Sequence, residues 1–408
     1  MPATIREEIV GGGQPGDFCT VRHLTLSGDQ ESIGALLAES AERNDGVGPQ
    51  PAPDPILTRA RRRWRTHFYP ELAARANGIA RRWGVDPDDD RFELAMLPFG
   101  FPTAGCSVAW IPPERTVSGT ALVSRNFDFT TQTLSELLGR APGPEEPTLA
   151  AHPYVIETYP EQGHATLIVC LFDLASGAVD GINDAGLVAA LLADNESTGV
   201  EPTYSPQVGL GEHEICRYLL ETCETVDDAV EALRLAKQYY EFVPCHYLVA
   251  DRAGRAFVWE HSGAHNREHI VWADGPQVVT NHLLHRYRAL GDLPAQPGNG
   301  ATYDRARRLT AAIDEAGRLD PEQLKDIHSC VRIGGSGGPV RTLWHVVYDP
   351  ATLTMQISFH LADTATGERR TAYKTFRLDT SHQPPTRDNL PQRDSTLRDV
   401  RPVERAGV

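Results

Sequence analysis

The sequence predicts an α+β protein in which β-sheets are covered by helices. Runs of strand-forming residues recur along the chain after residue 106, and pairs of helical segments interrupt them. The chain has 408 residues, of which 40% are hydrophobic, so it is long enough to bury a large core. Together these observations favour layers of sheet and helix over an all-helical or all-strand fold.

The first part of the chain, up to residue 105, mixes a few elements with a linker. A short strand is expected at 21–26, a helix at 31–42 and a Pro/Gly-rich linker at 44–55. A helix is expected over 57–83, because apolar residues recur there every three to four positions. Those apolar positions are Trp64, Phe68, Leu72, Ala76 and Ile79.

After residue 106 the pattern changes to strands. Segments 107–111 and 120–124 flank a turn that contains Pro112, Pro113 and Gly119, which predicts a hairpin starting at Cys106. Further strands are expected at 154–158, 165–173, 187–192, 246–251, 256–260, 277–280, 342–348 and 354–360. Helices are expected at 212–222, from an N-cap at Thr225, at 303–316 and from residue 322. Residues 381–408 are polar and Pro-rich, which predicts a disordered tail.

Charge and cysteine content exclude several functions. A formal net charge of −16 argues against nucleic-acid binding, and the basic cluster 59–65 is expected to be a solvated helix face paired with nearby acids. The seven cysteines have no regular spacing, so neither a disulfide framework nor a structural zinc site is expected. No leader or membrane-spanning stretch stands out. The sequence therefore predicts a reduced, cytoplasmic protein.

The pair Gly105–Cys106 is the most informative feature. A thiol attacks acyl groups as its thiolate, so it needs a nearby base. If the bond between Gly105 and Cys106 were cut, the new α-amine of Cys106 would be that base, because an α-amino group titrates near ~8. Glycine favours such a cut because it leaves room for attack on its carbonyl. We therefore expect Cys106 to become a nucleophile after self-cleavage.

Four segments carry a resemblance to a known family. They are Gly105–Cys106, Ser124 to Phe129 (SRNFDF), Asp180 to Leu187 (DGINDAGL) and Val279 to His282 (VTNH). In this order they resemble the cysteine-type N-terminal-nucleophile (Ntn) hydrolases, the group of penicillin V acylase and bile-salt hydrolase, and most of all its self-processing penicillin acyltransferase-like branch. The resemblance implies a four-layer αββα sandwich of two antiparallel sheets between helical layers. It also implies a propeptide at 1–105 and a catalytic domain at 106–380.

The resemblance also implies the site residues. Arg125 would lie near the thiolate, Asp128 would hold the α-amine of Cys106, and the two would form a charged pair. Asn281 and a main-chain N–H near Ala193 would stabilise the oxyanion, and Arg305 would lie near the substrate or the nucleophile. Asp304 stands where the acyltransferase has a serine, which puts the local substrate contact in doubt. Asn183 either braces Cys106 or belongs to a tight turn, and Arg125 with Asp128 could also form an ordinary ion pair.

The expected activity is hydrolysis or transfer at a linear, non-peptide amide through an acyl thioester on Cys106. The partners would be a small acyl amide and, for transfer, an amine, with no nucleic acid, membrane or cofactor. Two alternatives stay open. One is a Cys–His thiol hydrolase without chain cleavage, with His282 or His246 as base. The other is a non-enzymatic binding protein that keeps its first segment in place.

Two further patterns suggest ligand sites. Glu260, His261, His265, Glu268 and His269 could hold a metal if the segment were helical, but its Ser and Gly residues favour a polar turn. The glycine-rich run 334–338 is not followed by Lys-Ser/Thr, so a flexible loop is expected instead of a phosphate loop. No metal is therefore expected.

Overall fold

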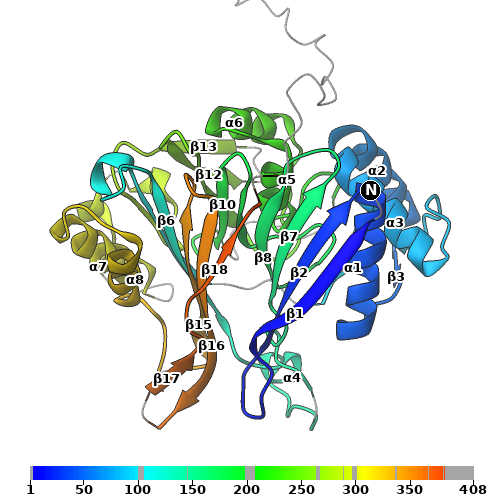
Figure 1. The fold of residues 1–408 in the computed structure, drawn as a ribbon, viewed down its shortest axis with the longest axis horizontal. Helices are drawn as coiled ribbons and strands as arrows, with labels where there is room; N and C mark the ends of the chain where they lie inside the picture. Colours follow the sequence, from blue (N-terminus) through cyan, green and yellow to red (C-terminus); the bar gives the residue numbers. More distant parts are fainter. Residues whose placement is uncertain are drawn as a thin grey trace, which may run out of the picture.

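The computed structural model describes residues 3–99, 105–144, 146–197, 207–262, 267–287, 289–295, 301–335, 338–365, 367–379 and 381. Two sheets pack face to face, and helices cover both outer faces (Figure 1). One buried cluster lies between the sheets, and a separate cluster lies under each helical layer. The expected α+β fold with four layers is therefore confirmed.

The larger sheet has nine strands within the described residues, in the order β1-β2-β7-β8-β9-β10-β11-β12-β13. Strands β2 and β7 pair in parallel, with Leu24 opposite Ile156. The expectation that both sheets are wholly antiparallel is therefore wrong for this sheet. The strands are β1 (Thr4–Gly12), β2 (Thr20–Gly28), β7 (Tyr154–Pro160), β8 (Thr166–Cys170), β9 (Asp180–Asn183), β10 (Val188–Ala193), β11 (Cys245–Ala250), β12 (Ala256–Ser262) and β13 (Arg267–Trp272).

The smaller sheet has seven strands within the described residues, in the order β14-β5-β6-β15-β16-β17, with β18 paired to β16. The predicted hairpin is its centre: β5 pairs antiparallel with β6, and Cys106 lies opposite Phe127. The strands are β5 (Gly105–Ile111), β6 (Leu122–Thr130), β14 (Gln277–Val279), β15 (Val340–Asp349), β16 (Thr354–Thr364), β17 (Gly367–Arg370) and β18 (Lys374–Arg377). A separate short pair joins β3 (Gln50–Pro51) to β4 (Phe92–Glu93).

Helices cover the larger sheet on one side and the smaller sheet on the other (Figure 1). The larger sheet is covered by α1 (Gln30–Asp45), α2 (Pro55–Phe68), α3 (Pro70–Trp83), α5 (Glu214–Thr222) and α6 (Val226–Leu235). The smaller sheet is covered by α7 (Thr302–Glu315) and α8 (Pro321–Ser329), and α4 (Leu134–Leu137) is a single turn. The expected N-cap at Thr225 is confirmed, because its hydroxyl accepts from Asp228 N in a capping box.

The expected helix over 57–83 is two helices. Pro70 lacks an N–H and cannot continue a helix, but it fits the first position of a new one, so α2 ends at Phe68 and α3 begins at Pro70. Helix α3 crosses α1 closely. A Cβ on Gly78 would lie 1.7 Å from Glu31 O, and a Cβ on Gly34 would lie 2.0 Å from Arg75 O. Glycine at both positions therefore permits the close approach.

Residues 3–99 do not have a core of their own. Strand β2 lies between β1 and β7 in the larger sheet, and α1 to α3 share the cluster that also contains α5 and α6. The first segment is thus built into the fold. The expected tail 381–408 lies outside the described residues except for Ser381.

All seven cysteines are free thiols, and six of them are buried. Among the described helices, none combines the length and the apolar character needed to cross a membrane.

Candidate active site

Strand β5 places Cys106 between the two sheets. Side chains alternate between the faces of a strand, so Cys106, Val108 and Trp110 enter the inter-sheet cluster while Ala109 and Ile111 face α7 and α8. The thiol is fully buried. Burial raises the pKa of Cys106, and the nearby Arg125 guanidinium only partly opposes that rise. In this unsplit chain the thiol is therefore protonated at neutral pH.

Arg125 reaches the thiol from the neighbouring strand. Its Nη2 donates to Cys106 Sγ at 3.1 Å and to Leu191 O at 2.6 Å. Its ion-pair partner is Asp180 on β9 of the opposite sheet, and both side chains are fully buried. Asp180 also accepts from Trp344 Nε1 at 3.2 Å and from Tyr348 Oη. The motif DGINDAGL contains Asp180, but its role as the partner of Arg125 was not predicted.

Asp128 does not pair with Arg125, which corrects the expected charged pair. The two residues are three apart on β6, and an odd spacing puts side chains on opposite faces of a strand. Asp128 instead accepts from Arg305 Nη1 at 3.1 Å and from Thr342 Oγ1 at 2.5 Å. It lies opposite Gly105 in the β5–β6 register, and burial raises its pKa.

Asn281 and Arg305 hold the main chain of Cys106. Asn281 Oδ1 accepts from Cys106 N at 2.9 Å and from Arg305 Nη2 at 2.6 Å. Arg305 Nη1 donates to Cys106 O at 2.7 Å. The structure thus brings together Cys106, Arg125, Asp128, Asn281 and Arg305.

Ala193 also lies next to Asn281. Asn281 Nδ2 donates to Ala193 O at 2.8 Å. The next residue, Asp194, bonds through its N–H to Pro244 O at 2.7 Å, so the N–H and C=O of Ala193 point away from β11, and the C=O accepts from Asn281. In the unsplit chain one of the two N–H donors of Asn281 Nδ2 is therefore occupied by Ala193 O.

Asn183 lies elsewhere, and we remove it from the candidate catalytic residues. Its neighbours on β9 alternate, so Asp180 and Ile182 face the inter-sheet core while Asn183 faces the helices. Its Nδ2 donates to Leu220 O at 2.9 Å and to Cys223 O at 2.7 Å, and its Oδ1 accepts from Leu187 N at 2.9 Å. These contacts give Asn183 a structural role, as the second alternative held. Asn183 is, however, the last residue of strand β9, and the turn follows it.

The two histidines of the Cys–His alternative bond to other groups. His246 Nε2 bonds to Thr280 O at 2.7 Å, and His282 Nδ1 bonds to Thr280 Oγ1 at 3.0 Å. Burial lowers the pKa of His282 to about 4. Among the described residues, the hydrogen-bond partner of Cys106 Sγ is Arg125.

The suggested metal array is not helical. Glu260 and His261 lie on β12, Glu268 and His269 lie on β13, and His265 is outside the described residues. Glu260 instead accepts from Leu284 N and from His285. Within the described ranges, no group of three or more His, Cys, Asp or Glu side chains could hold a metal ion.

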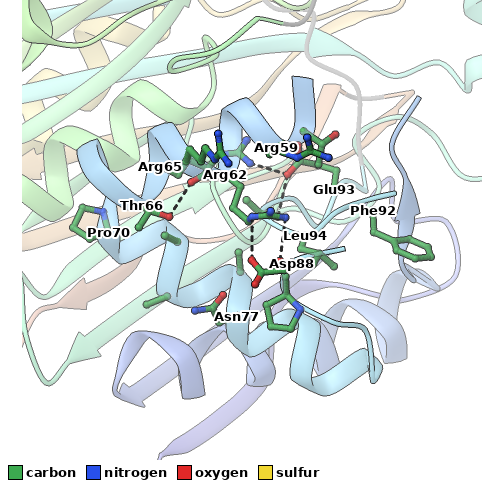
Figure 2. Close-up of a pocket in the computed structure, with 17 residues that line it drawn as sticks. Arg59, Arg62, Arg65, Thr66, Pro70, Asn77, Asp88, Phe92, Glu93 and Leu94 are labelled. Atoms are coloured by element: carbon green, nitrogen blue, oxygen red, sulfur yellow. Dashed lines mark hydrogen bonds and ion pairs between the residues drawn. The ribbon is translucent and has the colours of Figure 1, made fainter. Parts of the chain in front are cut away.

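A cavity of about 790 Å³ lies between α2, α3 and residues 87–95 (Figure 2). Cys106 is not among the residues that line it. Several arginines line it, but acids already pair with them: Arg59 with Asp90 at 2.6 Å, and Arg65 with Glu93 at 2.7 Å. Figure 2 also shows Arg62 directed at Asp88. This confirms the expected pairing of the basic cluster with nearby acids, but the expected solvated face is only partly correct, because Arg61 and Arg65 are buried. The cavity carries none of the groups around Cys106.

The layered fold matches the fold implied by the resemblance to the cysteine-type Ntn hydrolases. Residues 115–363 match the model of the family described as acyl-coenzyme A:6-aminopenicillanic acid acyl-transferase. The match covers well over half of the chain, so the chain belongs to this family. The matched range begins after Cys106 and does not include the Gly105–Cys106 junction.

Similar solved structures include penicillin V acylase from Agrobacterium tumefaciens, with 16% identity and a TM-score of 0.43, covering 65% of this chain and 84% of that one. They also include a mutant of conjugated bile acid hydrolase from Clostridium perfringens, with 16% identity and a TM-score of 0.43, covering 67% of this chain and 97% of that one. No curated protein matches the chain.

Proposed function

We propose that the protein is a self-processing cysteine amidohydrolase or acyltransferase that acts on a linear, non-peptide C–N amide bond. The observation that carries the proposal is the set of bonds around Cys106. Arg125 contacts the sulfur, Asn281 accepts from the main-chain N–H, and Arg305 donates to the main-chain carbonyl. Membership of an acyltransferase family supports the same class of reaction.

The first step would be cleavage of the Gly105–Cys106 bond. Water adds across the bond, which leaves a carboxylate on Gly105 and an amine on Cys106. Asp128 lies opposite Gly105 in the register of β5 and β6, and Asn281 Oδ1 already accepts from the nitrogen that becomes the amine. Both acceptors would then hold the new α-amine next to the sulfur, where it can take up the thiol proton and become an ammonium.

The mature enzyme would run a two-step acyl transfer. The thiol proton moves to the α-amine, and the sulfur attacks the amide carbon of the substrate. The oxyanion is stabilised by Asn281 Nδ2 and the N–H of Ala193. The C–N bond breaks as the ammonium protonates the leaving amine. Water or a second amine then attacks the acyl thioester and regenerates the thiol.

The two pieces, 1–105 and 106–408, would stay associated after cleavage. Strand β2 is an inner strand of the larger sheet. Glu221 of α5 accepts from Arg75 at 2.5 Å and from Tyr69 Oη at 2.6 Å, and all three side chains are buried. Loss of either piece would expose this buried charge network, which is costly.

Intact-mass measurement of the purified protein tests the proposal. We expect masses for residues 1–105 and 106–408 from the wild type, and one full-length mass from Cys106→Ala. Cys170→Ala, which changes another buried cysteine, is the control and should split normally. Incubation with a panel of acyl amides should then add one acyl group to the larger piece. A wild type that stays unsplit and is fully active would overturn self-processing, and an unsplit protein that is inactive toward every amide would favour the binding-protein alternative.

A further inference from the structure

Glu196 is a nearly buried carboxylate three residues after Ala193, and its side chain is 5% exposed. Its Oε1 accepts from Tyr287 Oη and from Tyr303 Oη, each at 2.6 Å. Its Oε2 accepts from Leu283 N at 3.0 Å and lies 3.6 Å from Arg286 Nη1. A carboxylate offers about four acceptor positions. All of them face groups of the protein, so Glu196 is placed to hold structure and not to bind a substrate.

The partners of Glu196 belong to the segments that carry the candidate site. Leu283 and Tyr287 follow Asn281 in the chain, and Tyr303 precedes Arg305 on α7. The segments are also joined next to Glu196, because Asn195 N donates to Asn281 O at 3.0 Å. Burial alone would raise the pKa of Glu196, but the bonds from Tyr287 and Tyr303 lower it, so the carboxylate is ionised at neutral pH.

We propose that Glu196 is a positioning residue that fixes the main chain at Ala193 relative to Asn281 and Arg305. This rests on the proposed function, in which Ala193 N–H and the Asn281 amide stabilise the same oxyanion. Such donors work only when they point at the position of the developing charge. A shift of about 1 Å in a supporting group can cost on the order of 100-fold in rate. One carboxylate that bonds to two segments of the site controls such a shift.

Glu196→Gln tests the proposal because it keeps the shape of the side chain but replaces one acceptor with a donor. We expect hydrogen exchange to quicken in peptides that cover 193–196 and 281–287, while the thermal midpoint shows that the protein is folded. We expect kcat of the split enzyme to fall by about 10- to 100-fold, with KM changed much less. A merely structural role would change stability without this loss of kcat.

Asp45→Asn is the matched control. Asp45 is also a nearly buried carboxylate that accepts from a tyrosine and a second residue, Tyr154 Oη and His152 Nδ1, each at 2.6 Å. It lies on α1 in the outer helical layer, and its substitution should quicken exchange around 152–154 but leave kcat unchanged. Tyr303→Phe removes one donor to Glu196 and serves as the milder variant if Glu196→Gln does not fold. Its effect on kcat should not add to that of Glu196→Gln.

Two results would overturn the proposal: faster exchange at 193–196 and 281–287 with unchanged kcat, or unchanged exchange in these peptides. If the wild type neither splits nor turns over any acyl amide, the proposed function fails. The exchange measurement then decides by itself whether Glu196 holds the two segments together.

Discussion

Acidification should destabilise the protein through His328, whose imidazole is buried next to the strand of the nucleophile. His328 Nε2 bonds to Ser107 Oγ at 2.9 Å, and its Nδ1 bonds to Ser124 Oγ at 2.8 Å. Ser124 Oγ also bonds to His345 Nε2 at 2.9 Å. Burial, with help from the positive charges of Arg305 and Arg332, lowers the pKa of His328 from 6.5 to about 3.

The size of the effect follows from this difference in pKa. A histidine with a lowered pKa is neutral in the folded chain but takes up a proton in the unfolded chain below pH 6.5, so stability is lost as the pH falls from 6.5 toward 3. Each pH unit in this window costs about 1.4 kcal/mol. Between pH 7.5 and pH 5, His328 alone should therefore remove about 2 kcal/mol of the free energy of unfolding.

Urea unfolding of the wild type and of His328→Asn at pH 7.5 and pH 5 measures this loss. Asn can bond to both serines but does not titrate, so the variant should lose about 2 kcal/mol less than the wild type over the same interval. Burial also lowers the pKa of His282 and His345. Both residues are present in the wild type and in the variant, so the difference between the two proteins reports His328. Glu260 has a pKa of about 2 and its ordinary value is 4.5, so it titrates below this window. Equal losses in the two proteins would refute the reasoning, and His345→Asn gives a second test if His328→Asn does not fold.

Three further predictions concern the candidate site. Asp128→Asn should slow self-cleavage and turnover and shift the acidic limb of the pH–rate profile, because it removes the charge expected to hold the α-amine; wild-type cleavage and an unchanged profile would leave Asp128 an ordinary partner of Arg305. Asn281→Ala should lower kcat by about 100-fold or more at nearly constant circular dichroism, and a loss of fold in its place would make Asn281 structural. EDTA or phenanthroline should leave the rate unchanged because Cys106 would supply both base and nucleophile; loss of activity that zinc restores would contradict this.

Local patterns predicted the central elements well. The hairpin at Cys106 was visible because Pro112, Pro113 and Gly119 mark its turn, and α6 was visible because Thr225 opens a capping box. Strand β9 was missed because DGINDAGL contains turn-forming residues, although Asp180 and Asn183 are strand residues held by β8 and β10. Strand β13 was missed because REHIVW is polar at its start and lies on the sheet edge. In both cases pairing with a distant strand outweighed local composition.

Most residues that lie around Cys106 could be named from the sequence, but Asn183 was wrongly among them, and the pairing of the charges could not be predicted. Arg125 and Asp128 are close in sequence, and sequence proximity suggested a pair. The partner of Arg125 is Asp180, 55 residues away on the other sheet, and the partner of Asp128 is Arg305, 177 residues away on α7. Only the packing of one sheet on the other and of α7 on the smaller sheet brings these charges together. The one local signal was the odd spacing on β6, which already excludes a shared face.

That separation of charges divides the surroundings of Cys106 into two parts. On the inter-sheet face, Arg125 contacts the sulfur, and Asp180 compensates its charge. On the helical face, Asp128 and Arg305 lie beside the main chain of residues 105 and 106. A buried charge that loses its partner is costly, so each pair is stable only as a unit. Arg125 and Asp180 therefore set the charge next to the thiol, and Asp128 and Arg305 set the charges next to the Gly105–Cys106 bond. Arg125 and Asp128 do so from opposite faces of β6.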